Sequence, residues 1–343
     1  MNGFTPMMTA ASHGHAHLVR LLMEKGADPH HIDSEHNSAL HLATINGSRE
    51  VVQLLLEKGL DVQAKGTHGR TALHDAAGFG HVELIDMLLA KESDISALAD
   101  NEITPLLLAA KAGHANAVEI LLARGASVQE QGLIERMAGG CDVDEEKIHL
   151  VQAAKGGSAR ALKALFFGGA TAQPPVTRMA LKRALNAEVV WALMDIDPDN
   201  FRSAAEDALL ALATDGNTPA LTAVLATRVE LSKERLASAL KAAAKHNRAD
   251  CVAALLDAGV ADEKHEGLLE AVKNRHTTCL AEFLRRGIPD DQKVKALTVA
   301  RETSQVEVMR MLVESGANPF AVDSKDVWGL IRRFQEQKML AIA

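Results

Sequence analysis

Aromatic residues are scarce in this sequence. Phenylalanine, tryptophan and tyrosine together make up 3% of the 343 residues, and tyrosine is absent. A core with so few rings must rely on leucine, alanine, valine and isoleucine, which suits thin helices that pack closely. Little material is left for aromatic cages around ammonium groups or for platforms on which nucleic-acid bases stack.

Long apolar runs are also missing. No stretch approaches the roughly 18 residues that a membrane-spanning helix requires, so we expect no membrane partner. The first residues, 1–6, have neither the charged region nor the apolar region of a secretory signal. We therefore expect a cytoplasmic protein. Export by a route that reads no N-terminal signal, and delivery to a host cell, remain alternatives.

The charge of the chain is unevenly distributed. The formal net charge is −8, and residues 1–130 hold 9 Lys or Arg against 16 Asp or Glu. Binding to nucleic acid depends on cationic contacts to phosphate, so we expect no nucleic-acid partner. An acidic region favours a protein partner that carries a basic patch, mainly by raising the association rate.

The sequence does have an internal repeat. One triplet returns every 33 residues, as Thr5-Pro6-Met7, Ser38-Ala39-Leu40, Thr71-Ala72-Leu73 and Thr104-Pro105-Leu106. Each copy continues with small residues, a glycine and an apolar run that contains a leucine pair or its equivalent. Self-similarity at this period predicts a stack of supersecondary units. Such stacks usually present a long surface to another macromolecule.

The third copy shows how one unit should fold. Thr71 is suited to cap a short helix, because its hydroxyl can accept a hydrogen bond from a free amide of the first turn. Gly80 interrupts the helical pattern and suits a tight connection. Leu84, Ile85, Leu88 and Leu89 then form the apolar stripe of a second helix. The unit is predicted to be a turn, a short helix, a loop and a longer helix.

These features resemble the ankyrin repeat, whose pattern is Thr-Pro-Leu-His-x-Ala, then Gly-His, an apolar pair and Gly-Ala. The matching residues of the third copy are Thr71, Leu73, His74, Ala76, Ala77, Gly80, His81 and Leu88. Residues 1–128 should be four regular ankyrin repeats. The resemblance implies a mainly α, ankyrin-type helical solenoid with β-turn fingers in the N-terminal units. Departures include Met8 and Leu107 in place of the motif histidine, and Glu92 in place of the closing glycine.

One core position extends the pattern through the rest of the chain. The second leucine of the pair is Leu22, Leu55, Leu88 and Leu121, and it continues as Leu165, Leu193, Val224, Leu255, Phe283 and Leu312. Residues 148–320 should therefore hold about six degenerate ankyrin-like helix pairs. Several of these later repeats are shorter by about the length of a finger, so we expect shorter connecting loops.

Two segments do not fit the repeat. Residues 129–147 form an acidic insertion, which is either a long loop or a joint between the two halves. Residues 321–343 contain apolar side chains at helical spacing and are predicted to form a C-terminal capping helix. A solenoid needs such a cap to cover its exposed end.

The reactive side chains show no catalytic pattern. Cys251 and Cys279 fall where the second copy has Val51, so we interpret them as small buried apolar residues. Cys141 lies in the insertion as a free thiol without a Cys-x-x-Cys partner. No Gly-x-Ser-x-Gly, His-Glu-x-x-His or phosphate-binding loop is present. The expectation is no catalytic residue, although a triad assembled from distant residues leaves no local pattern.

Histidine is abundant, with 15 residues. In the ankyrin family, the histidines that correspond to His15, His41, His74, His81 and His114 bond to backbone groups of loops and neighbouring units. His13, His15 and His17 alternate near His30 and His31, but nothing in their spacing supplies a converging ligand set with carboxylate or thiolate support. We expect no metal and no cofactor.

Partners of ankyrin proteins usually contact the fingers and the exposed side of the first helices. Carried over by register, this resemblance implies the partner-binding residues Asn37, Ile45, Asn46, His68, Arg70, Phe79, Ile103 and Lys111. Phe79 and Arg70 are the favoured anchors, because aromatic and arginine side chains often dominate interfaces. The alternative for Phe79 is that it packs on the next finger. The predicted structural core comprises Leu22, Leu55, Leu88, Leu121, Leu165, Leu255 and Leu312.

The leading hypothesis is a non-catalytic, monomeric scaffold, inhibitor or adaptor that binds a protein on its concave finger and first-helix surface. A first alternative is an exported effector or toxin-neutralising (immunity-type) ankyrin protein. A second is an enzyme whose site lies in the degenerate C-terminal half, which would show clustered histidines or carboxylates with perturbed pKa values in one pocket.

Overall fold

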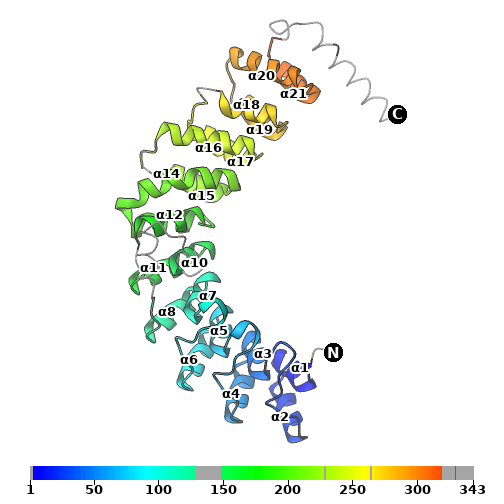
Figure 1. The fold of residues 1–343 in the computed structure, drawn as a ribbon, viewed down its shortest axis with the longest axis vertical. Coiled ribbons are helices and arrows are strands. Elements are labelled where there is room, and N and C mark those ends of the chain that lie inside the picture. The colour runs from blue at the N-terminus through cyan, green and yellow to red at the C-terminus, as the bar shows by residue number, and fades with distance from the viewer. Residues whose placement is uncertain are drawn as a thin grey trace, which may run out of the picture. The chain divides into compact units, whose positions relative to one another are not determined.

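The computed structural model describes residues 3–128, 148–170, 172–227, 229–262 and 265–318, together with Gly329 (Figure 1). Its regular elements are all helices, and one isolated antiparallel bridge joins Ile32 and Ser38. The predicted insertion at 129–147 lies outside the described residues, and so does the predicted capping helix at 321–343 apart from Gly329. The boundaries that the sequence sets for these segments stay predictions.

The chain divides into two compact units, Met1–Phe201 and Arg202–Ala343. In the first unit the helices follow each other in pairs, a first helix and a second helix, separated by a glycine-containing loop or another short connection. Its α-helices are α1 (Pro6–Ser12), α2 (Ala16–Glu24), α3 (Ala39–Asn46), α4 (Arg49–Glu57), α5 (Ala72–Gly78), α6 (Val82–Ala90), α7 (Pro105–Lys111), α8 (Ala115–Ala123), α10 (His149–Lys155), α11 (Ala159–Phe167), α12 (Pro174–Lys182) and α13 (Ala187–Ile196). Short 3-10 helices η1 (Thr67–Gly69) and η2 (Asp100–Glu102) lie in the connections before α5 and α7.

The second unit continues with the same alternation. Helix α14 (Pro198–Asp215) begins in the first unit and runs into the second. It is followed by α15 (Thr218–Ala226), α16 (Lys233–Lys245), α17 (Ala249–Asp257), α18 (Glu266–Lys273), α19 (Thr277–Arg285), α20 (Asp290–Glu302) and α21 (Val306–Glu314). The mainly helical repeat architecture predicted from the sequence is confirmed.

Several helices begin where side chains can satisfy their free amides. In α5, the Thr71 hydroxyl oxygen accepts from the His74 amide, and the Thr71 amide donates to Nδ1 of His74 at 3.1 Å. This reciprocal capping box fixes the start of the helix. Beyond its end, Gly80 has a φ of +73°, and a Cβ atom there would lie 2.8 Å from the ring of His114 in the next pair. Only glycine fits such a turn and such an approach.

Helix pairs stack on their neighbours in both units. In the first unit each first helix packs on the next one, in the order α1, α3, α5, α7, α10 and α12, and the second helices do the same in the order α2, α4, α6, α8, α11 and α13. In the second unit, α16, α18 and α20 form one row, and α15, α17, α19 and α21 form the other. Each pair therefore covers the apolar side of the next, as in other solenoids.

Leucine and alanine supply most of the core. Six residues of the predicted structural core are completely buried: Leu55, Leu88, Leu121, Leu165, Leu255 and Leu312. Leu22 differs, because it is only half-buried. It lies on α2, in the first described pair, which packs on the pair formed by α3 and α4. Alanines such as Ala76 and Ala77 have no exposed surface and let the helices approach closely.

A side-chain hydrogen bond ties successive pairs together. The residue that precedes the second helix of a pair reaches a backbone carbonyl at the C-terminal end of the first helix in the preceding pair. The bonded atoms are His81 Nε2 and Ile45 O (3.0 Å), Asn186 Nδ2 and Gly157 O (2.8 Å), Arg248 Nε and Thr214 O (2.9 Å), His276 Nδ1 and Ala244 O (2.8 Å), and Gln305 Nε2 and Lys273 O (3.4 Å). Carbonyls at helix C-termini lack intrahelical partners, so these bonds satisfy groups that would otherwise depend on water. We call this contact the pair-to-pair bond.

The loops between pairs differ along the chain. Residues 25–38, 58–71 and 91–104 connect the early pairs, whereas a later connection such as 286–289 is shorter. The long loops share a backbone hydrogen bond at one register: Asp33 N to Asn37 O, Gly66 N to Arg70 O, and Ala99 N to Ile103 O, each between 2.8 and 2.9 Å. These long loops and the first helices form the side of the molecule on which the candidate site lies.

Candidate protein-binding surface

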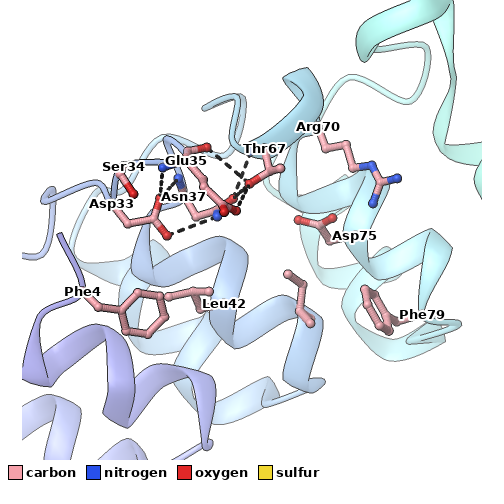
Figure 2. A pocket seen from close by; sticks show the side chains of 11 residues that line it. Phe4, Asp33, Ser34, Glu35, Asn37, Leu42, Thr67, Arg70, Asp75 and Phe79 are labelled. Atoms are coloured by element: carbon pink, nitrogen blue, oxygen red, sulfur yellow. Dashed lines mark hydrogen bonds between the residues drawn. The ribbon is translucent and has the colours of Figure 1, made fainter. Parts of the chain in front are cut away.

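A hollow of about 380 Å³ opens between the loops and first helices of the first three pairs (Figure 2). Four of the eight predicted partner-binding residues line it: Asn37, Ile45, Arg70 and Phe79. The stacking thus brings together residues from α3, from α5 and from two loops. The remaining lining residues are Phe4, Asp33, Ser34, Glu35, Leu42, Thr67 and Asp75.

Apolar side chains form the lower wall of the hollow as Figure 2 shows it. Phe4 and Phe79 are each 49% exposed, and Ile45 is 36% exposed. The ring of Phe79 stacks on His81 of its own pair, with ring centroids 6.2 Å apart. Large apolar side chains that are gathered and exposed in this way are typical of a surface that another molecule covers.

The polar rim is built by the loop before α3. Asp33 accepts hydrogen bonds from the amides of Glu35 and Asn37, both at 2.8 Å, and from the Asn37 side chain at 3.2 Å. The Asn37 side-chain oxygen in turn accepts from the Thr67 amide at 3.0 Å and from its hydroxyl at 2.9 Å. Asn37 therefore lines the hollow, but it is 9% exposed and joins two neighbouring loops. Its position in the sequence did not reveal that structural role.

Asp75 is the functional candidate that sequence reasoning missed. Its side chain is 5% exposed, and its carboxylate points into the hollow from α5 (Figure 2). Burial raises the pKa of Asp75 to about 7, against the opposing effect of the positive charge on Arg70. A signal was available, because the other copies have Thr9, Leu42 and Leu108 at this register. An acid at an otherwise uncharged position in a first helix could have been noticed.

The other four predicted partner-binding residues do not line the hollow. His68 is exposed in η1 with a φ of +57°, and Lys111 is exposed at the end of α7. Asn46 is also exposed, and its side-chain oxygen accepts a hydrogen bond from the Ser48 hydroxyl. Ile103 is half-buried, and its carbonyl oxygen lies 3.0 Å from Nε2 of His74.

The two histidines at the starts of α3 and α5 link neighbouring units. His41 Nε2 lies 3.1 Å from the Ala64 carbonyl, as His74 Nε2 does from Ile103, while Nδ1 of each ring faces the capping residue of its own helix. This pattern suits the neutral ring with the proton on Nε2. Burial lowers the pKa of His41, and it lowers the pKa of His74 to about 4.

The described residues contain no group of three histidine, cysteine or acidic side chains placed to hold a metal ion. Cys251 and Cys279 are buried. Burial raises the pKa of Cys251, and it raises the pKa of Cys279 to about 11, so both thiols are protonated at neutral pH. Among the same residues, no helix is both long enough and apolar enough to cross a membrane.

The fold defines a helical repeat protein in which paired helices stack on their neighbours. Residues 1–66 and 64–132 match the family model for ankyrin repeats in three copies. The match falls on the part of the chain in which the sequence resembles ankyrin repeats. A curated relative, the human DNA-binding protein RFXANK, is 49% identical over 45 residues, which are 13% of this chain and 17% of the relative. The chain thus matches less than a fifth of that protein's length.

Proposed function

We propose that this chain is a non-catalytic scaffold, inhibitor or adaptor that binds a protein partner on the concave finger and first-helix surface of its early pairs. Ankyrin repeats generally mediate protein–protein interaction, and residues 1–132 match that family. The observation that carries the proposal is the hollow, where Phe4, Ile45 and Phe79 are exposed next to the charged Arg70 and Asp75. Exposed aromatic residues beside an arginine are frequent interface anchors.

The same proposal includes a cytoplasmic monomer that binds neither nucleic acid nor membranes. Its support is the excess of 16 acidic over 9 basic residues in residues 1–130, where the hollow lies. That charge repels phosphate backbones and favours a partner with a basic surface.

The enzyme alternative is less well supported than binding. It needs a reactive group in the degenerate half, and an attacking thiol requires a lowered pKa. The two described cysteines there have raised pKa values because they are buried. The effector or toxin-neutralising alternative uses the same binding surface in another biological setting, so the identity of the partner decides between them.

A pull-down from cell extract with quantitative mass spectrometry tests the proposal. The bait is the full chain, compared with the double variant Phe79→Ala/Arg70→Ala. The matched control is Arg20→Ala/Leu21→Ala, which also removes an arginine and an exposed apolar side chain, but from α2. We expect the first variant to lose partners that the wild type and the control retain. A correctly folded Phe79→Ala/Arg70→Ala chain that keeps every partner would contradict the choice of surface.

A further inference from the structure

The carboxylate of Asp75 is the one polar group of the hollow that is deeply buried and yet makes no hydrogen bond in the described residues. Asp33, on the opposite rim, accepts three hydrogen bonds from its own loop. Asp75 has no such partner, and its neighbours on α3 are the apolar side chains of Leu42 and Ile45. An ionised carboxylate in such surroundings is costly unless it is paired.

Arg70 does not supply that pair. It lies before α5 and its charge acts on Asp75, but no nitrogen of its guanidinium is within ion-pair distance of the carboxylate. The pKa of Asp75 rises to about 7 in spite of Arg70, which is consistent with a carboxylate whose charge is left uncompensated. A positively charged group placed against the Asp75 carboxylate would therefore stabilise its ionised form.

The lining of the hollow also favours a cation over an anion. Asp33, Glu35 and Asp75 contribute three carboxyl groups, and Arg70 is the one basic residue among the lining side chains. The exposed side chains of Phe79 and Ile45 line the same hollow as Asp75, so an occupant must bring an apolar group together with its positive charge.

We propose that the hollow binds a segment of a partner protein that inserts a lysine or arginine side chain against Asp75 while a neighbouring apolar side chain packs on Phe79 and Ile45. This inference rests on the proposed function and adds the chemistry of the partner. It gives Phe79 the role of an apolar anchor. On this proposal the positive charge of Arg70 opposes the incoming side chain, so the loss of partners expected for Phe79→Ala/Arg70→Ala is due to the missing Phe79 ring.

The test is the selection of peptides from a random phage-displayed library on the immobilised full chain. Asp75→Asn removes the charge with little change of shape, and Glu50→Gln is the matched control, because it removes an exposed acid on α4 outside the hollow. Thermal melts establish that both variants fold. We expect wild type and Glu50→Gln to enrich peptides with a lysine or arginine beside an apolar residue, and Asp75→Asn to lose that enrichment.

Fluorescence anisotropy with a selected peptide then measures the pairing directly. The peptide should bind Asp75→Asn about tenfold more weakly than wild type, because a desolvated charge pair is lost. Replacing the basic residue of the peptide by glutamine should weaken binding to wild type by a similar factor and have little further effect on Asp75→Asn. Arg70→Gln should bind the basic peptide more tightly than wild type.

Four results would overturn the inference. Three of them are enrichment of acidic peptides that require Arg70, equal binding of basic peptides to Asp75→Asn, and no enrichment above bare support. Selected peptides that lack a cation but require Phe79 would remove the inference and leave the proposed function standing. The proposed function itself is tested independently by the pull-down with the Phe79→Ala/Arg70→Ala variant.

Discussion

The early pairs, residues 3–128, and the later pairs, residues 148–314, are built by the same physical rules with different side chains. The pair-to-pair bond shows this best, because His81 makes it in one early pair, whereas an asparagine, an arginine, a histidine and a glutamine make it in later pairs. A helix-end carbonyl requires a donor at the right place, and several side chains can provide one. The family pattern can therefore weaken while the architecture persists.

The two regions differ more in their loops. The early loops are long, share one backbone register and line the hollow together with the first helices. Later loops such as 286–289 connect one pair to the next directly. Stability is thus distributed over both regions, whereas the candidate binding surface depends on the early loops.

The largest change in stability is expected for substitutions of core leucines, which test whether the early and later regions have equally well packed cores. Leu88→Ala in α6 and Leu255→Ala in α17 should each lower the free energy of unfolding by about 2–5 kcal/mol, because each leaves a cavity among buried side chains. Leu22→Ala should cost less, since Leu22 is half-buried. Urea denaturation followed by circular dichroism measures all three. A loss below 1 kcal/mol for Leu255→Ala would mean that the later core is loosely packed.

Buried aspartates provide the next comparison. Asp75 has no hydrogen-bond partner, whereas Asp197 in the later region accepts from Thr177 at 2.5 Å and from Asn200 at 2.9 Å. Asp75→Asn should stabilise the fold at pH 8, by at most about 4 kcal/mol at 1.36 kcal/mol per pKa unit. Asp197→Asn should destabilise it by about 1–2 kcal/mol, because a charge-assisted bond is lost.

The stability gained by Asp75→Asn should depend on pH, because the pKa of Asp75 is raised in the folded state. The folded-state pKa is raised to about 7, so the folded protein holds this proton more tightly than the unfolded chain does. The stabilising contribution of protonated Asp75 is complete below about pH 4 and is lost as the pH rises towards 7. The gain from Asp75→Asn should therefore vanish near pH 4 in denaturation curves. A gain that is the same at pH 4 and pH 8 would point to a cause other than charge.

His74 tests the early region with the opposite sign. Its pKa is lowered to about 4 in the folded state, so the unfolded chain takes up the proton first. The contribution of His74 is present above about pH 6.5 and should fall by up to about 3 kcal/mol as the pH drops towards 4. His74→Gln should be less stable at pH 7.5 and show a flatter pH profile in thermal melts. An unchanged profile would assign the acid sensitivity to other groups.

The smallest expected effect concerns the pair-to-pair bond. His81→Ala and Arg248→Ala should each cost about 0.5–1.5 kcal/mol, the usual net contribution of one hydrogen bond. His15→Ala is the control, since His15 precedes α2 at the same register and its side chain makes no hydrogen bond within the described residues. Chemical denaturation should separate the three. Equal losses for His15 and Arg248 would show that the bond across pairs contributes nothing beyond local effects.

Much of the fold could be read from local features of the sequence. The 33-residue period, the capping residue Thr71 and the leucine stripe of α6 are local features, and they determine helices within one unit. Only part of the candidate binding surface could be predicted from these local features. Register predicted Ile45 and Phe79 as partner-binding residues, and both line the hollow. It could not show that Asn37 is hydrogen-bonded to Thr67, or that the Asp75 carboxylate is buried without a hydrogen-bond partner among the described residues.

The sequence by itself determined the repeating unit, its caps and its core, because these depend on residues a few positions apart along one chain segment. The tertiary structure decided which side chains of different units line one hollow, such as Phe4, Asp75 and Phe79, and which donors replace one another in the pair-to-pair bond. The physical reason is that contacts between units arise only when neighbouring pairs stack, and stacking constrains geometry and hydrogen bonding without requiring a fixed residue.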